Sequence, residues 1–227
     1  MGLASFGFLV RSVACPPNMI LVFGEDENDR RALVELTRGL RPDLSNVKIQ
    51  TRRNPVIHMK KGDLPATKRR VVDEVAALVR AQQVLGKVTA VIAHEDCDDL
   101  EPAHVDLSNS IEAALTAAGV PQPIAATPAW EMEAWWMLFP NALAEVRRCW
   151  KQLQDRPRNV GMVRDAKESL MRSLRPSPNN GRCPDYAESD SVQIAKNAAR
   201  LGLLAQNTQA TSASFNEFRR KVLALRL

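Results

Sequence analysis

The sequence predicts an α/β protein in which a parallel β-sheet is flanked by helices and followed by a helical C-terminal extension. Through the first two thirds of the chain, short apolar runs alternate with segments whose apolar residues recur at helical spacing, which is typical of a parallel sheet. Beyond Pro140 the helical spacing continues alone. We therefore expect an N-terminal extension at residues 1–18, an α/β domain at 19–140 and a helical extension at 141–227 that packs on it.

Four short apolar segments are the predicted strands, because strands that are buried on both faces of a parallel sheet are nearly continuous apolar runs. The first and third segments, MILVF and KVTAVIA, are the clearest examples. The second is more polar and the fourth is short. The four segments are residues 19–23, 46–51, 87–93 and 122–127.

The predicted helices of this domain lie between the strands, where apolar side chains recur every three or four residues. The clearest helix covers residues 66–85, where a stripe of valines and leucines avoids the charged residues, and Gly86 ends it. Pro42 and Gly119 end the helices that follow the first and third strands. A further helix begins in WEMEAWWMLF, residues 130–139, after the last strand.

The C-terminal extension shows helical periodicity interrupted by one long loop. Apolar residues between Leu143 and Leu153 share one helical face, and those between Val163 and Leu174 share another. Residues 175–190, with three prolines and a glycine, are predicted to be a loop. Ser214 and Glu217 give the S-x-x-E pattern of a capping box, which predicts the start of the last helix.

Length and composition are those of an ordinary globular protein and indicate neither disorder nor a membrane span. The chain has 227 residues, of which 45% are hydrophobic and 25% charged, and its net charge is +5. Basic residues gather at 48–70 and 147–182, and acidic residues gather at 25–29 and 95–101. This segregation suits a protein that grips phosphates with one surface and binds a metal with another, although solvated helix faces give the same pattern.

The four cysteines favour a reducing compartment. Cys15, Cys97, Cys149 and Cys183 are far apart in the chain and form no C-x-x-C pair. Their spacing predicts neither a disulfide framework nor a zinc knuckle, so the cytoplasm is the expected location.

Acidic residues follow three of the predicted strands directly. Glu25 follows the first strand, Asp96 and Asp98 follow the third, and Glu131 and Glu133 follow the fourth. The carboxyl ends of parallel strands meet at one edge of a sheet, where residues from distant parts of the sequence come together. Converging carboxylates repel one another unless a cation neutralises them, and oxygen ligands suit Mg²⁺ or Mn²⁺. The sequence thus predicts a metal site, with a solvated acidic loop as the alternative.

The spacing within each acidic pair sets a condition for sharing a metal. Asp96 and Asp98 point the same way if their segment is extended. Glu131 and Glu133 both turn inward only if Glu131 lies before the first helical turn, since residues two apart on a helix diverge by about 200°. We expect His94 to be a structural residue rather than a ligand. The tryptophans after the fourth strand are expected to fill the seam between the sheet and the C-terminal helices.

Taken in order, the motifs GED after the first strand, EDCD after the third and EMEAWW after the fourth resemble the TOPRIM domain of topoisomerases, primases and OLD-type nucleases. The resemblance implies that Glu25 is a general acid/base or metal ligand and that Asp96 and Asp98 hold Mg²⁺. ATPAWEMEAWWML and SASFNEF resemble small standalone bacterial TOPRIM-like proteins, which are linked to phage defence and often encoded beside an ATPase. Asp99 and Leu100 stand where many TOPRIM loops have glycine, which leaves the number of metals open.

The resemblance implies a cytoplasmic, metal-dependent nuclease that hydrolyses phosphodiester bonds in DNA or RNA as the effector of an antiphage system. Glu25, Asp96 and Asp98 would be its catalytic residues, and Glu131 and Glu133 would complete the site if two ions of Mg²⁺ or Mn²⁺ bind. The first basic stretch would hold the nucleic-acid backbone, with solvated surface as the alternative for its lysines. Its residues are Arg52, Arg53, Lys60, Lys61, Arg69 and Arg70.

A catalytically silent subunit is the second function that the sequence leaves open. The same fold would then bind or regulate a partner ATPase of the ABC/SMC-like or AAA type. No Walker A glycine loop occurs in the sequence, so ATP hydrolysis would have to come from another chain. The substrate, the trigger and assembly into a homo-oligomer stay open, and no membrane partner is expected.

Overall fold

A four-stranded parallel β-sheet forms the centre of the computed structural model, which describes residues 18–154, 156–176, 183–205 and 209–227. The strands are β1 (Asn18–Phe23), β2 (Lys48–Arg52), β3 (Lys87–His94) and β4 (Pro123–Ala126), and their order is β2-β1-β3-β4. The predicted α/β class and the parallel sheet flanked by helices are confirmed. Nearly all of the predicted extension at 1–18 lies outside the described residues.

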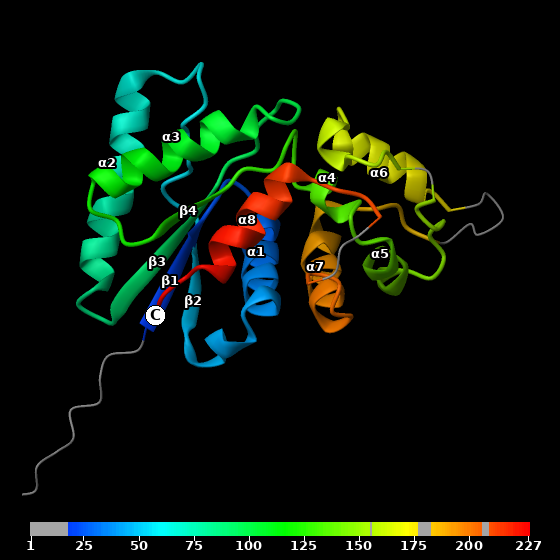
Figure 1. Cartoon of the computed structure of the whole chain (residues 1–227), viewed down its shortest axis with the longest axis horizontal. Helices are drawn as coiled ribbons and strands as arrows, with labels where there is room; N and C mark the ends of the chain where they lie inside the picture. Colours follow the sequence, from blue (N-terminus) through cyan, green and yellow to red (C-terminus); the bar gives the residue numbers. More distant parts are fainter. Residues whose placement is uncertain (1–17, 155, 177–182, 206–208) are drawn as a thin grey trace, which may run out of the picture.

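The two faces of the sheet bury two separate cores, because successive strand residues point to opposite sides. On one face, Leu21 and Val91 pack against α2 (Pro65–Gln82) and α3 (His104–Ala117). On the other, Ile20 and Ile92 pack against α1 (Glu27–Leu40) and α8 (Ala213–Leu223). We call these the α2 face and the α1 face; Figure 1 shows the helices on either side of the sheet.

The remaining helices form a lobe beside α1, drawn from green through yellow to orange in Figure 1. They are α4 (Glu133–Trp136), α5 (Pro140–Val146), α6 (Ala166–Leu174) and α7 (Ser191–Arg200), with 3-10 turns η2 (Val160–Met162) and η3 (Glu188–Asp190) in their connections. A further 3-10 turn, η1 (Pro42–Asn46), connects α1 to β2. Helix α7 approaches α1 closely at Gly39, where a Cβ atom would lie only 2.5 Å from the Cβ of Ala199. The close approach requires glycine at this position.

The aromatic residues after β4 fill the junction between the sheet and the C-terminal helices, as predicted. Trp135 and Trp136 have no exposed surface. The ring of Trp135 stacks on Phe218 at 5.2 Å between centroids and meets Phe215 edge-on at 5.4 Å. Because both phenylalanines lie on α8, these contacts fix the last helix to the α4 segment.

Two details of the C-terminal helices differ from the prediction. The helix expected to run to Leu153 ends at Val146, and Trp150 is buried from an irregular segment in which its indole N–H donates to the Pro184 carbonyl at 2.8 Å. The N-cap of α8 is Ser212 rather than Ser214, since the Ser212 hydroxyl accepts the Phe215 N–H at 3.2 Å. At Trp150 a tertiary contact outweighs the local helical pattern, whereas at Ser212 a different local cap is used.

One cysteine pair corrects the sequence prediction. Cys149 and Cys183 form a disulfide with Cα atoms 6.0 Å apart, whereas Cys97 is free and Cys15 lies outside the described residues. The two bonded cysteines are 34 residues apart, and only the folded chain brings them within bonding distance. The cytoplasmic location rested on the lack of a disulfide pattern and stays a prediction.

Within the described residues, no helix combines the length and the apolar character that crossing a lipid bilayer requires.

Candidate functional site

Four carboxylates gather on the α1 face at the carboxyl edge of the sheet, and we call them the acidic cluster. Asp29 comes from the first turn of α1, Asp96 from the segment after β3, and Glu131 and Glu133 from the segment after β4. They are close enough for their charges to raise one another's pKa: Asp96 acts on Asp29 and Glu131, and Glu131 acts on Glu133. Of the acids predicted to meet, Asp96, Glu131 and Glu133 lie in this cluster with Asp29 as an added member, whereas Glu25 and Asp98 do not.

The segment after β3 keeps the alternation of the strand for three more residues. Glu95 N–H donates to the Ala126 carbonyl at 3.2 Å and Cys97 N–H to the Pro128 carbonyl at 3.0 Å, which extends the pairing of β3 with β4. Asp96 consequently points to the α1 face with His94, while Glu95 points to the α2 face, where it accepts the Met59 N–H.

The alternation breaks at Asp98, whose backbone is left-handed with φ of +52°. Trp130, opposite it, is also left-handed at +60°, and the Asp98 N–H donates to the Trp130 carbonyl at 3.0 Å. The Asp98 carboxylate is exposed and forms an ion pair with Lys60, in the loop before α2. The extended conformation that would let Asp96 and Asp98 share a metal is therefore absent, and the two carboxylates have different partners.

His94 supplies a positive charge inside the acidic cluster. Its ring is 1% exposed, and Nε2 lies 3.2 Å from Oδ1 of Asp96 without the alignment of a hydrogen bond. Burial by itself lowers the pKa of His94, but attraction to Asp96 and to the charge of Asp29 raises it to about 9. His94 is thus an imidazolium at neutral pH, a stronger role than the structural one expected.

Glu133 is the most deeply buried acid of the cluster, at 5% exposure. Its Oε1 accepts the Tyr186 hydroxyl at 2.9 Å, and that hydroxyl also contacts Ser191 at 3.0 Å. Burial raises the pKa of Glu133 to about 8, and the neighbouring Glu131 adds to the shift. Glu133 therefore holds a proton at neutral pH, unless a cation binds nearby.

Glu131 and Asp29 complete the cluster. Glu131 precedes α4, which is the condition for both glutamates to turn inward, and its Oε1 accepts the Lys167 N–H at 2.7 Å. Burial raises the pKa of Glu131 above its ordinary value and raises that of Asp29 to about 6. Asp29 was not among the predicted site residues. Its neighbour Asp26 caps α1 by accepting the Asn28 N–H at 2.6 Å, which places Asp29 on the first turn of the helix.

Glu25, which was predicted to be a catalytic residue and a metal ligand, lies outside the acidic cluster. Its side chain is exposed at the end of β1, and Arg30 binds the Glu25 backbone carbonyl at 2.9 Å. Of the predicted nucleic-acid contacts, Lys60 pairs with Asp98 and Arg70 lies 3.8 Å from Glu74. The remaining ones lie at the end of β2, in the following loop and on the first turns of α2; they are Arg52, Arg53, Lys61 and Arg69.

The oxygen donors of the acidic cluster fit Mg²⁺ or Mn²⁺ chemically. Oδ1 of Asp96 is buried and accepts no hydrogen bond from the described residues, although Nε2 of His94 lies 3.2 Å away, so a bound cation would compete with that imidazolium for it. The four carboxylates are nevertheless spread out: within the described ranges, the group with three ligand atoms inside 4.8 Å of one another is His58, Asp63 and Glu95, on the α2 face. None of the five predicted metal ligands belongs to that group.

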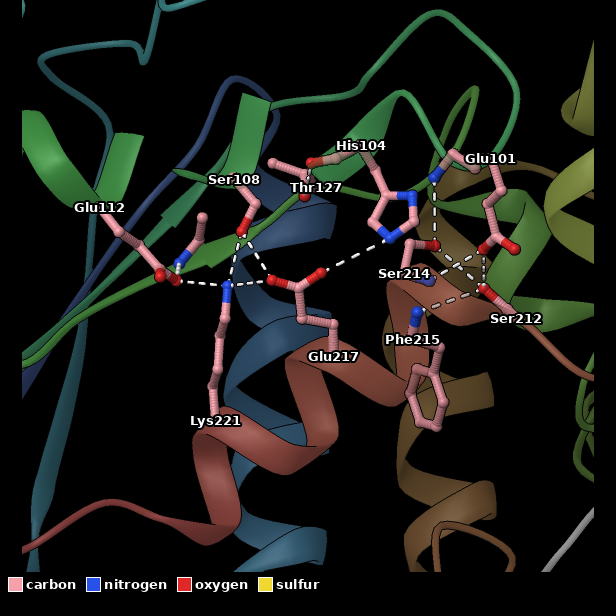
Figure 2. A network of polar contacts seen from close by, with 12 residues as sticks. Glu101, His104, Ser108, Glu112, Thr127, Ser212, Ser214, Phe215, Glu217 and Lys221 are labelled. Atoms are coloured by element: carbon pink, nitrogen blue, oxygen red, sulfur yellow. Dashed lines mark hydrogen bonds and ion pairs between the residues drawn. The ribbon is translucent and has the colours of Figure 1, made fainter. Parts of the chain in front are cut away.

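A second network of buried charges joins α3 to α8 around the edge of β4, and we call it the α3–α8 network (Figure 2). Glu101 accepts the Ser214 N–H and the Ser212 hydroxyl, both at 2.8 Å. Lys221 pairs with Glu217 and, at 2.6 Å, with Glu112. Glu112 also accepts the Ala125 N–H at 2.8 Å, which covers the free edge of β4.

Comparisons with protein-family models, curated proteins and solved structures found no match to this chain.

Proposed function

We propose that the chain is a metal-dependent nuclease that hydrolyses phosphodiester bonds of DNA or RNA, with Mg²⁺ or Mn²⁺ at the acidic cluster. The convergence of four carboxylates on one sheet edge carries this proposal. Burial and mutual repulsion raise the pKa of Asp29, Glu131 and Glu133, which makes the cluster costly to the fold without a cation. Carboxylates with raised pKa values in a cluster of this kind are common at functional sites.

The residues of the cluster divide into binding and positioning roles. Asp96 and Asp29 would hold the ion, which when bound polarises a phosphate and activates water. Glu131 is fixed by the Lys167 N–H and Glu133 by the Tyr186 hydroxyl, so both carboxylates are oriented before any ligand arrives. Glu25 is exposed at the end of β1 and is the proposed acid/base group that meets the substrate.

The basic side chains after β2 are proposed to grip the sugar-phosphate backbone. Arg53, Lys61 and Arg69 are exposed in the loop and on the first turns of α2, free to reach a polyanion. Contacts of this kind position a strand without reading its sequence. We therefore propose binding that falls steeply with salt and shows little base preference.

A cleavage assay with paired variants tests this function. The full chain is incubated with plasmid, single-stranded DNA and tRNA in Mg²⁺, Mn²⁺ or EDTA, and Asp96→Asn and Asp98→Asn are purified in parallel. We expect cleavage that requires the metal, a loss of activity in Asp96→Asn and a smaller loss in Asp98→Asn, because Asp98 pairs with Lys60. Equal activity of wild type and Asp96→Asn would reject the acidic cluster as the catalytic centre.

The catalytically silent subunit is the second candidate, and one observation favours it. The protein's own cations already neutralise part of the predicted site, since His94 lies against Asp96 and Lys60 pairs with Asp98. A silent subunit would show no cleavage with any substrate, alone or together with an ATPase encoded beside it. The wild type and the Asp96→Asn variant would then bind that ATPase equally well. Cleavage that appears only with the ATPase present would instead assign the chain as the nuclease of a two-part antiphage system.

A further inference from the structure

A group of ligands on the α2 face is separate from the acidic cluster. His58 and Asp63 lie in the loop between β2 and α2, and Glu95 lies directly after β3. One ligand atom from each lies within 4.8 Å of the other two. Glu95 and Asp96 are neighbours in sequence but point to opposite faces of the sheet, so a ligand at one group does not reach the other.

Glu95 is held in place before any ligand binds. It is 5% exposed, and its two carboxylate oxygens accept the Met59 N–H at 3.1 and 2.9 Å. The loop that carries His58 and Asp63 is thereby fastened to the end of β3. A turn in which the Asp63 N–H donates to the Lys60 carbonyl at 3.0 Å orients the other end of the loop. The three side chains are thus brought together by rigid backbone contacts.

Asp63 carries the observation that points to a ligand. Asp63 is half-buried, and its Oδ2 atom is buried and accepts no hydrogen bond from the described residues. The other carboxylate of the group, that of Glu95, cannot donate one while it is ionised. A buried acceptor without a partner costs about 1 to 3 kcal/mol and more when it is charged. Lys60, the nearby cation, is engaged with Asp98 rather than with Asp63. A bound cation would satisfy the orphan oxygen and offset the repulsion between the two carboxylates.

We propose that His58, Asp63 and Glu95 bind a divalent first-row transition metal such as Zn²⁺. One imidazole nitrogen and two carboxylate oxygens match the donors of such ions, whereas Mg²⁺ and Ca²⁺ prefer oxygen ligands alone. Three protein ligands leave a coordination position free, and the exposure of His58 puts that position at the surface, where water or an anion can reach it. The site stands apart from the proposed nuclease function and is expected whether or not the chain cleaves nucleic acid.

Metal binding by matched variants tests the site. The full chain is stripped with a chelator and titrated with Co²⁺, whose visible absorbance reports imidazole and carboxylate ligation, and then with Zn²⁺ as a competitor. We expect a single tightly bound ion per chain. Affinity should fall by at least about 10-fold in His58→Ala and in Asp63→Asn, since even outer-shell partners of a metal contribute this much. Asp96→Asn, which removes a ligand from the acidic cluster, should bind Co²⁺ as the wild type does.

Two results would overturn the proposal. One is a wild type that binds neither Co²⁺ nor Zn²⁺ after stripping. The other is binding that survives in His58→Ala and Asp63→Asn but is lost in Asp96→Asn, which would place the ion at the acidic cluster. His58 is exposed, so its replacement leaves the fold intact, and a melting curve of each variant without metal checks this.

Discussion

The acidic cluster and the α3–α8 network both bury carboxylates beside a histidine, yet their protonation behaviour is opposite. In the network, burial raises the pKa of Glu101 and Glu217, but donors from Ser214 and Lys221 outweigh it and bring both below their ordinary values. In the cluster, burial and repulsion prevail, and the pKa of Glu133 rises to about 8. In the network, hydrogen-bond donors and a lysine contact the carboxylates. In the cluster, there are too few donors to offset burial and the repulsion between the carboxylates.

The two histidines repeat the contrast. His104, whose Nε2 lies 3.5 Å from Glu217, has its pKa lowered chiefly by burial and is neutral at physiological pH. His94 is equally buried, but its pKa rises to about 9 beside Asp96. A region with balanced charges stabilises the fold, here by closing the edge of β4. A region with an excess of one charge is where we place the chemistry.

The largest expected effect is a loss of cleavage activity in a variant of the acidic cluster, compared with a loss of stability in a variant of the α3–α8 network. Asp96→Asn should reduce metal-dependent cleavage by at least about 100-fold, because it removes a proposed ligand, whereas outer-shell changes cost 10 to 100-fold. Its melting temperature should fall only moderately, because the loss of the partner of His94 is offset in part by relief of the repulsion that Asp96 exerts on Asp29 and Glu131. Glu101→Gln, a buried acid of the α3–α8 network, should do the reverse and lower the melting temperature while cleavage persists. If both variants lost activity in proportion to stability, the two regions would not differ in role.

Removing the disulfide should loosen the cluster side of the molecule. The bond between Cys149 and Cys183 closes a long loop, and Tyr186, the donor to Glu133, follows it closely. Cys149→Ser should lower the free energy of unfolding by about 3 to 4 kcal/mol, measured by urea denaturation, because the unfolded chain regains the entropy of that loop. Cys97→Ser, at the free cysteine, serves as the control. A reductant that leaves the wild-type midpoint unchanged would contradict this assignment.

A glycine beside Glu101 tests how closely the α3–α8 network is packed. A Cβ atom at Gly161 would lie 2.0 Å from Cδ of Glu101, so Gly161→Ala should displace the carboxylate from its donors. We expect a loss of about 2 kcal/mol, the cost of overpacking a buried site. Gly62→Ala is the matched control, since its Cβ would meet nothing within 4 Å. Equal melting temperatures for the two variants would show that Glu101 can move to accommodate the added methyl group without loss of stability.

A slope of stability with pH is the remaining test of the contrast. Glu133 has a folded pKa of about 8 and His94 one of about 9, both above their unfolded values. The folded chain therefore keeps protons that the unfolded chain releases, and stability present near pH 6 should be lost as pH rises towards 9. Melting curves should fall by several degrees over this range without metal.

Glu133→Gln keeps an acceptor for Tyr186 but no longer titrates, so its pH slope should be flatter than that of the wild type. Glu145→Gln, at a surface pair with Arg200, should leave the slope unchanged. Mg²⁺ should raise the melting temperature most at high pH, where the carboxylates are ionised. A wild-type melting temperature that rises between about pH 6 and 9 would show that the folded state does not raise the pKa values of the cluster.

Local patterns predicted the layers of the fold well, and tertiary geometry limited the prediction of the site. MILVF and KVTAVIA became β1 and β3 because a buried parallel strand is visible in a short apolar run. The roles of Asp96 and Asp98 depended on the backbone at Asp98, and a left-handed residue there leaves no mark on an acidic sequence. Asp29 was hidden among the acids of GEDENDR, because its inward direction depends on where α1 begins.

The ligands of the α2 face were missed for a related reason. His58 and Asp63 lie in a loop without periodicity, and Glu95 is more than thirty residues further along the chain. The hydrogen bonds from the Met59 N–H to Glu95, together with the burial of Ile57 and Met59, hold the loop at the strand end. The disulfide was missed likewise, since the spacing of Cys149 and Cys183 contains no information about their approach.

The extended pairing of residues 94–97 with the segment after β4 has a consequence for how this protein can evolve. His94 and Asp96 serve one face while Glu95 serves the other, so inserting or deleting one residue in this stretch would exchange the acids between the faces. The two sites therefore depend on the same alternation of side chains along one extended segment. Neither can shift along the strand without the other, and changes that improve one site must be substitutions rather than insertions.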